Sequence, residues 1–139
     1  MNWFSKLFSP DPRKTREDQT FGHLEYEGGM WINPKGLNGE GPMIVIYALI
    51  EGPSQQQRDF YLQLQPRLDG LCDAARAFLK ISGMLDFNPA NLSLYSIEIP
   101  ENEVIANDAF LLEFTDEEAN TVFGVGFEKG IPKTSHADD

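Results

Sequence analysis

The chain has 139 residues, a single cysteine and a formal net charge of −11 at pH 7. This length allows one domain with a single core that needs neither a metal nor a disulfide to fold. The lone Cys72 excludes an intramolecular disulfide and a cysteine-based zinc site. The negative charge disfavours binding to nucleic acid and to anionic membranes, and it favours cationic partners.

Two features of the sequence predict a cytoplasmic location. The longest apolar run, residues 43–50, is of strand length and far below the roughly 18 to 20 residues that span a bilayer. The first residues contain no apolar stretch of signal-peptide length and no small-residue cleavage site.

Residues 1–19 are expected to form an amphipathic arm and a flexible linker. The segment that follows the first turns is polar and contains Pro10 and Pro12, without a hydrophobic period. The arm has two interpretations: a weak anchor to a membrane surface or a partner, or a terminal turn that packs on its own domain or frays. The aromatic and aliphatic residues at helical spacing are Trp3, Phe4, Leu7 and Phe8.

From Phe21 the pattern alternates with a period of two, as in a half-buried strand. Gly28 and Gly29 then supply the positive φ angles of a tight hairpin turn, and Trp31 in the second strand is expected in the core. A loop rich in glycine and proline follows. Residues 43–50 are apolar on both faces, which predicts a central strand covered on both sides.

A long amphipathic helix is predicted next. Ser54 and Gln57 fit a capping box, and apolar residues recur at steps of three and four as far as Ile81. Pro66 lies within this stripe and removes a backbone donor, so we expect a kink or break near Gln65.

Three more strands are expected, at 92–99, 109–114 and 121–128, with the last two joined by an acidic hairpin loop. The predicted fold is α+β, an antiparallel sheet packed against one main amphipathic helical segment in the order β-β-β-α-β-β-β. Residues 20–131 are expected to form the single domain, and residues 132–139 a disordered tail.

Two clusters could carry a binding function. His23, Glu25 and Glu27 project from one side of a strand, where they could hold a divalent metal or form a solvated strand face. A second cluster could bind calcium or a basic partner, or serve as a charged hairpin tip, and it lacks the residues of an EF-hand loop. This cluster comprises Asp116, Glu117 and Glu118, and Glu113 could join it.

No motif for catalysis or cofactor binding is recognisable. The sequence contains no G-x-S-x-G element, and its glycine-rich loop lacks the lysine of a Walker motif. Cys72 lies beside the apolar stripe of the helix, which favours a buried structural thiol over a nucleophile. We therefore predict no catalytic residue, no cofactor and no metal ligand.

Several short motifs resemble a group of uncharacterised small bacterial domains, some of which are found as immunity-like proteins beside bacterial toxins. The resemblance covers residues 20–130 and implies a fold and a bacterial origin more than an activity. The segments that carry it are Phe21-Gly22-x-Leu24, Trp31, Gly52-Pro53-Ser54 to Gln57, and Asp116-Glu117-Glu118 followed by Phe123-Gly124-Val125-Gly126-Phe127.

The leading hypothesis is a non-enzymatic protein-interaction module, such as an immunity-type inhibitor of a basic partner protein. The negative charge and the lack of a catalytic motif support it. One alternative is a peripheral membrane or scaffold protein that uses the N-terminal arm, and another is an enzyme without a recognisable motif. The residues expected to contact a partner are Asp116, Glu117, Glu118, His23, Glu25 and Glu27.

Overall fold

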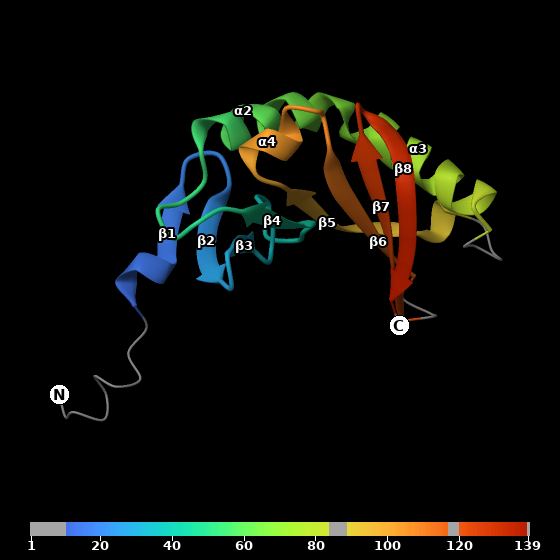
Figure 1. Cartoon of the computed structure of the whole chain (residues 1–139). Coiled ribbons are helices and arrows are strands. Elements are labelled where there is room, and N and C mark those ends of the chain that lie inside the picture. The colour runs from blue at the N-terminus through green and yellow to red at the C-terminus, as the bar shows by residue number, and fades with distance from the viewer. Residues whose placement is uncertain (1–10, 84–88, 117–119, 139) are drawn as a thin grey trace.

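The computed structural model describes residues 11–83, 89–116 and 120–138. One sheet and one long, interrupted helix make up most of this structure (Figure 1). The strands are β1 (Thr15–Asp18), β2 (Gly22–Glu27), β3 (Met30–Asn33), β4 (Met43–Tyr47), β5 (Ser93–Ile99), β6 (Phe110–Asp116), β7 (Thr121–Glu128) and β8 (Ile131–Asp138). The helices are α2 (Gln55–Leu64), α3 (Leu68–Ile81) and α4 (Asn102–Ile105), with 3-10 turns η1 (Pro12–Lys14), η2 (Gln65–Arg67) and η3 (Pro89–Asn91).

The eight strands lie side by side in sequence order, from β1 to β8. Every neighbouring pair is antiparallel except β4 and β5, which run parallel. A parallel pair needs a crossover connection, and the long helix supplies it. The α+β class and the single main helix are confirmed, whereas a purely antiparallel sheet is wrong at this central pair.

The predicted strand order is also wrong, because four strands rather than three stand on each side of the helix. Thr15–Asp18, expected in a flexible linker, pair with β2. Ile131–Asp138, all but the first of which were expected in a disordered tail, pair with β7. Both are edge strands with mostly exposed polar side chains, so neither shows the apolar alternation by which a strand is recognised.

The long helix follows its sequence signals closely. Gln57 N–H donates to the Ser54 hydroxyl, and the Gln57 side chain accepts from Ser54 N–H, which confirms the capping box. Pro66 lies in η2, which separates α2 from α3 and confirms the expected break. The side chains that the helix buries toward the sheet include Phe60, Leu64, Leu71, Ala75 and Leu79.

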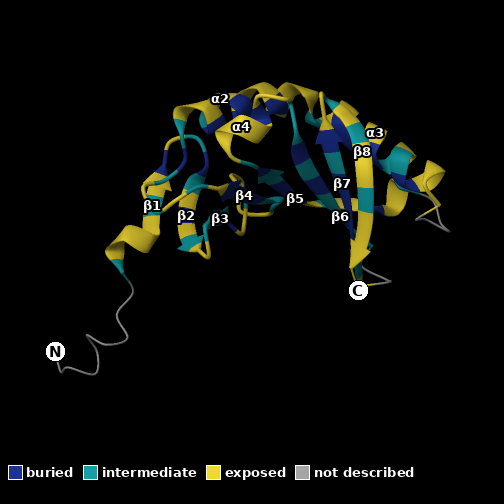
Figure 2. Ribbon diagram, in the orientation of Figure 1, coloured by how far each residue is buried: buried dark blue, intermediate teal, exposed yellow. Residues whose placement is uncertain are grey.

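The two faces of the sheet differ in what covers them. The face under α2 and α3 holds the core, seen as buried strand segments in Figure 2. Trp31 is fully buried, as predicted. The opposite face, called the open face below, carries no helix among the described residues apart from α4 at one end of the strands. As predicted, β4 is a central strand with buried residues on both faces, Ile44 and Ile46 toward the helix and Val45 on the open face. The cover on the open face is incomplete, because Tyr47 there is 37% exposed. The core residues on the strands are Leu24, Trp31, Ile44, Ile46, Ile97, Ile99, Phe110, Leu112, Phe114, Phe123, Val125 and Phe127.

Within the described residues, no helix combines the length and the apolar character that crossing a membrane requires.

Candidate functional site

The strand register gathers carboxylates on the open face. One row of paired residues crosses the sheet from Glu25 through Ile32 and Val45 to Glu98 and then Leu111. A second row joins Met43, Ser96, Glu113, Gly124 and His136. Strand residues paired in this way share a face, so side chains far apart in the sequence lie together.

We call this surface the acidic face. None of the strand positions that the register pairs on it is lysine or arginine, and its two histidines are His23 and His136. A surface of one charge sign attracts partners of the opposite sign and orients them on approach. Its carboxylates are Glu17, Glu25, Glu27, Glu98, Glu113, Glu128 and Asp138.

His23, Glu25 and Glu27 alternate outward along β2 and are exposed, as the sequence predicts for a solvated strand face. His23 Nδ1 contacts the Glu17 carboxylate, and its Nε2 lies 3.8 Å from Glu25. The hydrogen bond to Glu17 raises the pKa of His23, and the negative charge of Glu25 adds to the shift. The described residues include no group of three or more acidic, histidine or cysteine side chains that could hold a metal ion.

The centre of the acidic face is ordered by two hydrogen bonds. Tyr47 Oη donates to Glu98 Oε1 at 3.0 Å, and Ser96 Oγ donates to Glu113 Oε1 at 2.7 Å. Burial raises the pKa of Glu98 despite the Tyr47 hydrogen bond. Burial, together with the charge of Glu98, also raises the pKa of Tyr47 to about 12. Tyr47 is therefore a neutral donor at physiological pH.

His136 extends the acidic face onto β8. A Cβ atom on Gly124 would collide with the His136 ring, so the glycine provides the space in which the imidazole lies. The sequence interpretation placed His136 in the expected disordered tail, residues 132–139. The signal that connects His136 to Gly124 is the register of β8, which no local pattern of residues reveals.

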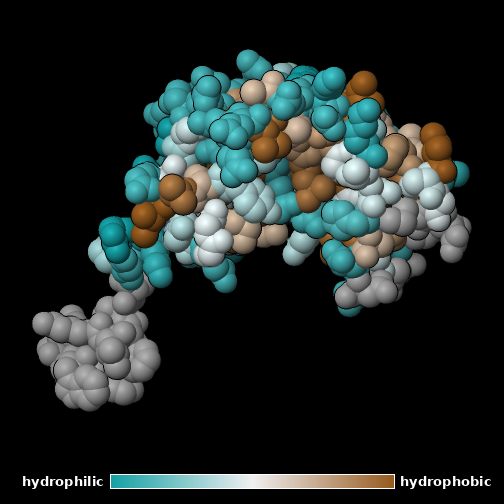
Figure 3. Space-filling view, in the orientation of Figure 1, coloured by the Kyte–Doolittle hydropathy of each residue, from teal (hydrophilic) through white to brown (hydrophobic). Residues whose placement is uncertain are grey.

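A pocket lies at the carboxyl ends of β4 and β5, beside α4. Its volume is about 280 Å³ and its lining is almost entirely apolar, with Tyr47 and Glu98 as the polar members. Figure 3 shows the surface hollowed between the half of the molecule built on β1–β4 and the half built on β6–β8. The remaining lining residues are Pro100, Val104, Ala109, Phe110, Leu111 and Phe127.

The second predicted cluster is only partly described. Asp116 ends β6 opposite Thr121, which confirms the hairpin, whereas Glu117 and Glu118 lie outside the described residues. The alternation of β6 places Asp116 on the side of Phe114 and not on that of Glu113. Because β3, β4 and β5 lie between β2 and β6, the structure places Asp116 apart from His23, Glu25 and Glu27.

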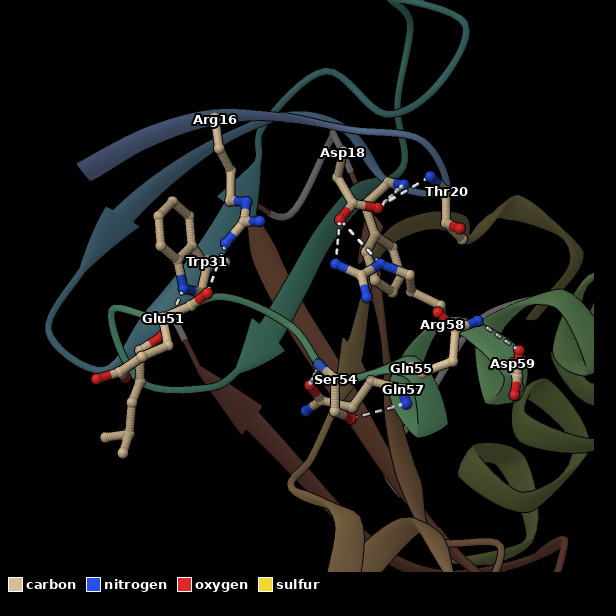
Figure 4. A network of polar contacts seen from close by, with 12 residues as sticks. Arg16, Asp18, Thr20, Trp31, Glu51, Ser54, Gln55, Gln57, Arg58 and Asp59 are labelled. Atoms are coloured by element: carbon tan, nitrogen blue, oxygen red, sulfur yellow. Dashed lines mark hydrogen bonds and ion pairs between the residues drawn. The ribbon is translucent and has the colours of Figure 1, made fainter. Parts of the chain in front are cut away.

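A separate polar network joins β1 to the start of the long helix (Figure 4). Arg58 donates to Asp18 Oδ2 through Nε and Nη2 at 3.0 and 2.8 Å, and the backbone N–H groups of Thr20 and Phe21 donate to Oδ1. Burial alone would raise the pKa of Asp18, but these hydrogen bonds outweigh it and lower the pKa. Both oxygens of the Asp18 carboxylate, whose side chain is 2% exposed, accept hydrogen bonds within the chain. The carboxylate therefore holds the fold together and is not free to bind a ligand.

Two other sequence predictions concern single features. Cys72 is buried as expected, and burial raises the pKa of its thiol to about 11, so it is not an activated nucleophile. The apolar residues of the N-terminal arm, Trp3, Phe4, Leu7 and Phe8, lie outside the described residues.

Comparisons of the chain with protein-family models, with curated proteins and with solved structures find no match.

Proposed function

We propose that this chain is a non-enzymatic interaction module that binds a basic protein through the acidic face of its sheet. The observation that carries the proposal is the separation of charge: the face that no long helix covers holds seven carboxylates at paired positions, and none of its paired positions is lysine or arginine. The seven are Glu17, Glu25, Glu27, Glu98, Glu113, Glu128 and Asp138.

The surface of the long helix has a different character. There Arg67 pairs with Asp108 and Arg76 pairs with Asp73, so opposite charges partly cancel within the chain. Charges that are already paired contribute little to attracting a partner. On the acidic face the ion pairs of the described residues involve histidines only, His23 with Glu17 and Glu25 and His136 with Asp138. Most of its negative charge is therefore left for a basic partner to neutralise.

An immunity-type inhibitor is the form of this function that the sequence resemblance favours. A protein of this kind works by covering the basic surface of a toxin, which requires an exposed, preformed acidic surface. Most of the acidic face lies on strands, and each inner strand is held by backbone hydrogen bonds to a neighbouring strand on both sides. A preformed surface loses little conformational entropy when it binds.

The experiment compares three variants that each remove three negative charges. Glu25→Gln, Glu27→Gln and Glu113→Gln together alter the acidic face. Asp59→Asn, Asp69→Asn and Asp73→Asn together alter exposed positions on α2 and α3. The third variant replaces the predicted hairpin cluster, Asp116→Asn, Glu117→Gln and Glu118→Gln. Each protein, and the unmodified chain, serves as bait for a pull-down from cytosol at low salt, followed by measurement of association rates with the captured partner.

We expect a basic partner that the unmodified chain and the helix variant retain and that the acidic-face variant loses. Its association rate should fall several-fold in the acidic-face variant, and it should fall for the unmodified chain as salt rises from 0.1 to 1 M. If all three variants lost the partner equally, binding would depend only on the net charge of the chain and not on the acidic face. Loss confined to the hairpin variant would move the contact to residues 116–118, and capture that depends on the N-terminal arm would favour the peripheral alternative.

A further inference from the structure

We infer that the pocket beside α4 receives an arginine side chain of the basic partner, with its guanidinium at Glu98. The inference rests on the proposed function and names the group that would anchor the partner to the acidic face. The pocket opens on this face, because its two polar residues lie in rows of paired strand residues that begin on β2. Tyr47 lies in the row of Glu27, and Glu98 lies in the row of Glu25.

The size and lining of the pocket suit one long side chain. Its volume of about 280 Å³ lies just below the range of roughly 300 to 1,000 Å³ typical of small-molecule sites. Apolar walls formed in part by Pro100, Val104 and Leu111 match the methylene groups of a long basic side chain, which pack against apolar surface while the charged end seeks a polar partner.

Glu98 is the charged group that such a side chain would meet. Its carboxylate accepts one hydrogen bond, from Tyr47, and among the described residues it forms no ion pair with lysine or arginine. Because burial opposes its charge, a carboxylate in this position gains more from an added cation than an exposed one does.

Arginine fits these surroundings better than lysine. The guanidinium group is planar and more weakly hydrated than an ammonium group, so it loses less when apolar walls replace water. Its several N–H donors can bond the free positions of the Glu98 carboxylate while the side chain of Tyr47 keeps its own hydrogen bond. Arginine is also enriched in protein interfaces, where lysine is depleted.

The test is an NMR titration of the full chain at low ionic strength with three small probes. The probes are N-acetyl-arginine methylamide, the corresponding lysine compound, and the citrulline compound, which keeps the shape of arginine without its charge. The variants are Glu98→Gln, which keeps the acceptor for Tyr47 but removes the charge, and Val104→Phe, which fills the pocket from α4. Glu27→Gln is the matched control, because it removes a carboxylate from the same face outside the pocket.

We expect the arginine probe to shift the amide signals of the pocket residues in a saturable way, at least fivefold more tightly than the citrulline and lysine probes. Glu98→Gln and Val104→Phe should each weaken this binding at least fivefold, and Glu27→Gln should change it less than twofold. If Val104→Phe perturbs folding, the conservative Glu98→Gln still decides the result. Equal binding of the citrulline or lysine probe, or shifts spread over the acidic face without saturation, would overturn the inference.

The two proposals can fail separately. If the acidic-face variant loses a basic partner while the arginine probe does not bind the pocket, the proposed function stands and this inference is wrong. If the arginine probe binds the pocket while the acidic-face variant retains every partner, the pocket site stands and the proposed function is wrong.

Discussion

The two faces of this sheet are built from the same strands, but one face forms the core and the other carries exposed carboxylates. Along β6, Leu112 and Phe114 point under the long helix and are fully buried, whereas their neighbours Leu111 and Glu113 line the acidic face. Alternation along a strand therefore lets one short segment supply both the core and a charged surface. The comparison teaches that, in this chain, adjacent residues can be tested for stability and for binding almost independently.

The largest difference in stability should be between alanine variants of two neighbouring leucines that lie on opposite faces of β6. Leu112→Ala removes a fully buried side chain, and we expect it to lower the free energy of unfolding by about 2 to 5 kcal/mol. Leu111→Ala, on the half-buried open face, should cost about 1 kcal/mol or less. Urea unfolding of both variants measures the difference. Equal losses would show that the open face is packed as tightly as the core.

Breaking the buried ion pair between Asp18 and Arg58 should cause the next largest loss of stability, because this pair joins β1 to α2. Arg58→Met keeps the apolar stem but leaves the buried Asp18 carboxylate with its two backbone donors only, which should cost about 1 to 3 kcal/mol at pH 7. Glu17→Gln, an exposed position on the same strand, is the control and should change the stability little.

The same pair predicts a dependence on pH. The pKa of Asp18 is lower in the folded chain than in the unfolded chain, so its contribution is present above the unfolded value of about 3.9 and is lost as pH falls through the folded pKa. The difference in stability between the unmodified chain and Arg58→Met should therefore shrink below about pH 4. A difference that stays constant down to pH 2 would contradict this assignment.

The parts of the fold that the sequence predicts are those with strong local signals. The Gly28-Gly29 turn, the capping box at Ser54 and the break at Pro66 each depend on residues within a few positions of one another. β6 and β7 show apolar alternation because one of their faces is buried. β1 and β8 lack this pattern because they are edge strands, and β4–β5 pairing joins residues about fifty positions apart that no local rule connects.

The candidate site follows the same division. Glu25 and Glu27 can be placed on an exposed strand face from alternation alone, and the structure confirms that placement. Glu98 and His136 are missed because their position on the acidic face depends on which strands are neighbours and on their register. Glu113 was grouped with Asp116, but the two lie on opposite faces of β6. Carboxylates that look scattered in the sequence become one surface only when the sheet forms.

A smaller effect concerns the cost in stability of burying the Glu98 carboxylate. Burial raises its pKa in the folded chain, so its stabilising contribution is complete below the unfolded pKa of about 4.3 and is lost as pH rises through the folded value. We expect Glu98→Gln to be slightly more stable than the unmodified chain at pH 7, by less than about 1 kcal/mol, and equal to it near pH 4. Thermal unfolding at both pH values measures this, and a destabilised variant at pH 7 would assign Glu98 a structural role.

The smallest effect concerns the exposed end of the acidic face, where β1 and β2 meet. His23 Nδ1 contacts Glu17, and this hydrogen bond raises the pKa of the imidazole. NMR titration of His23 should therefore give a value above its usual pKa, and Glu17→Gln should return it toward that value. Glu27→Gln, on the same face of β2 and outside this contact, should leave it unchanged. The contribution of His23 to stability is present below its unfolded pKa of about 6.5 and is lost as pH rises through the folded value. Because β1 was expected to be a flexible linker, this pKa also tests the strand pairing: an unshifted His23 would mean that Thr15–Asp18 do not hold Glu17 opposite His23 in solution.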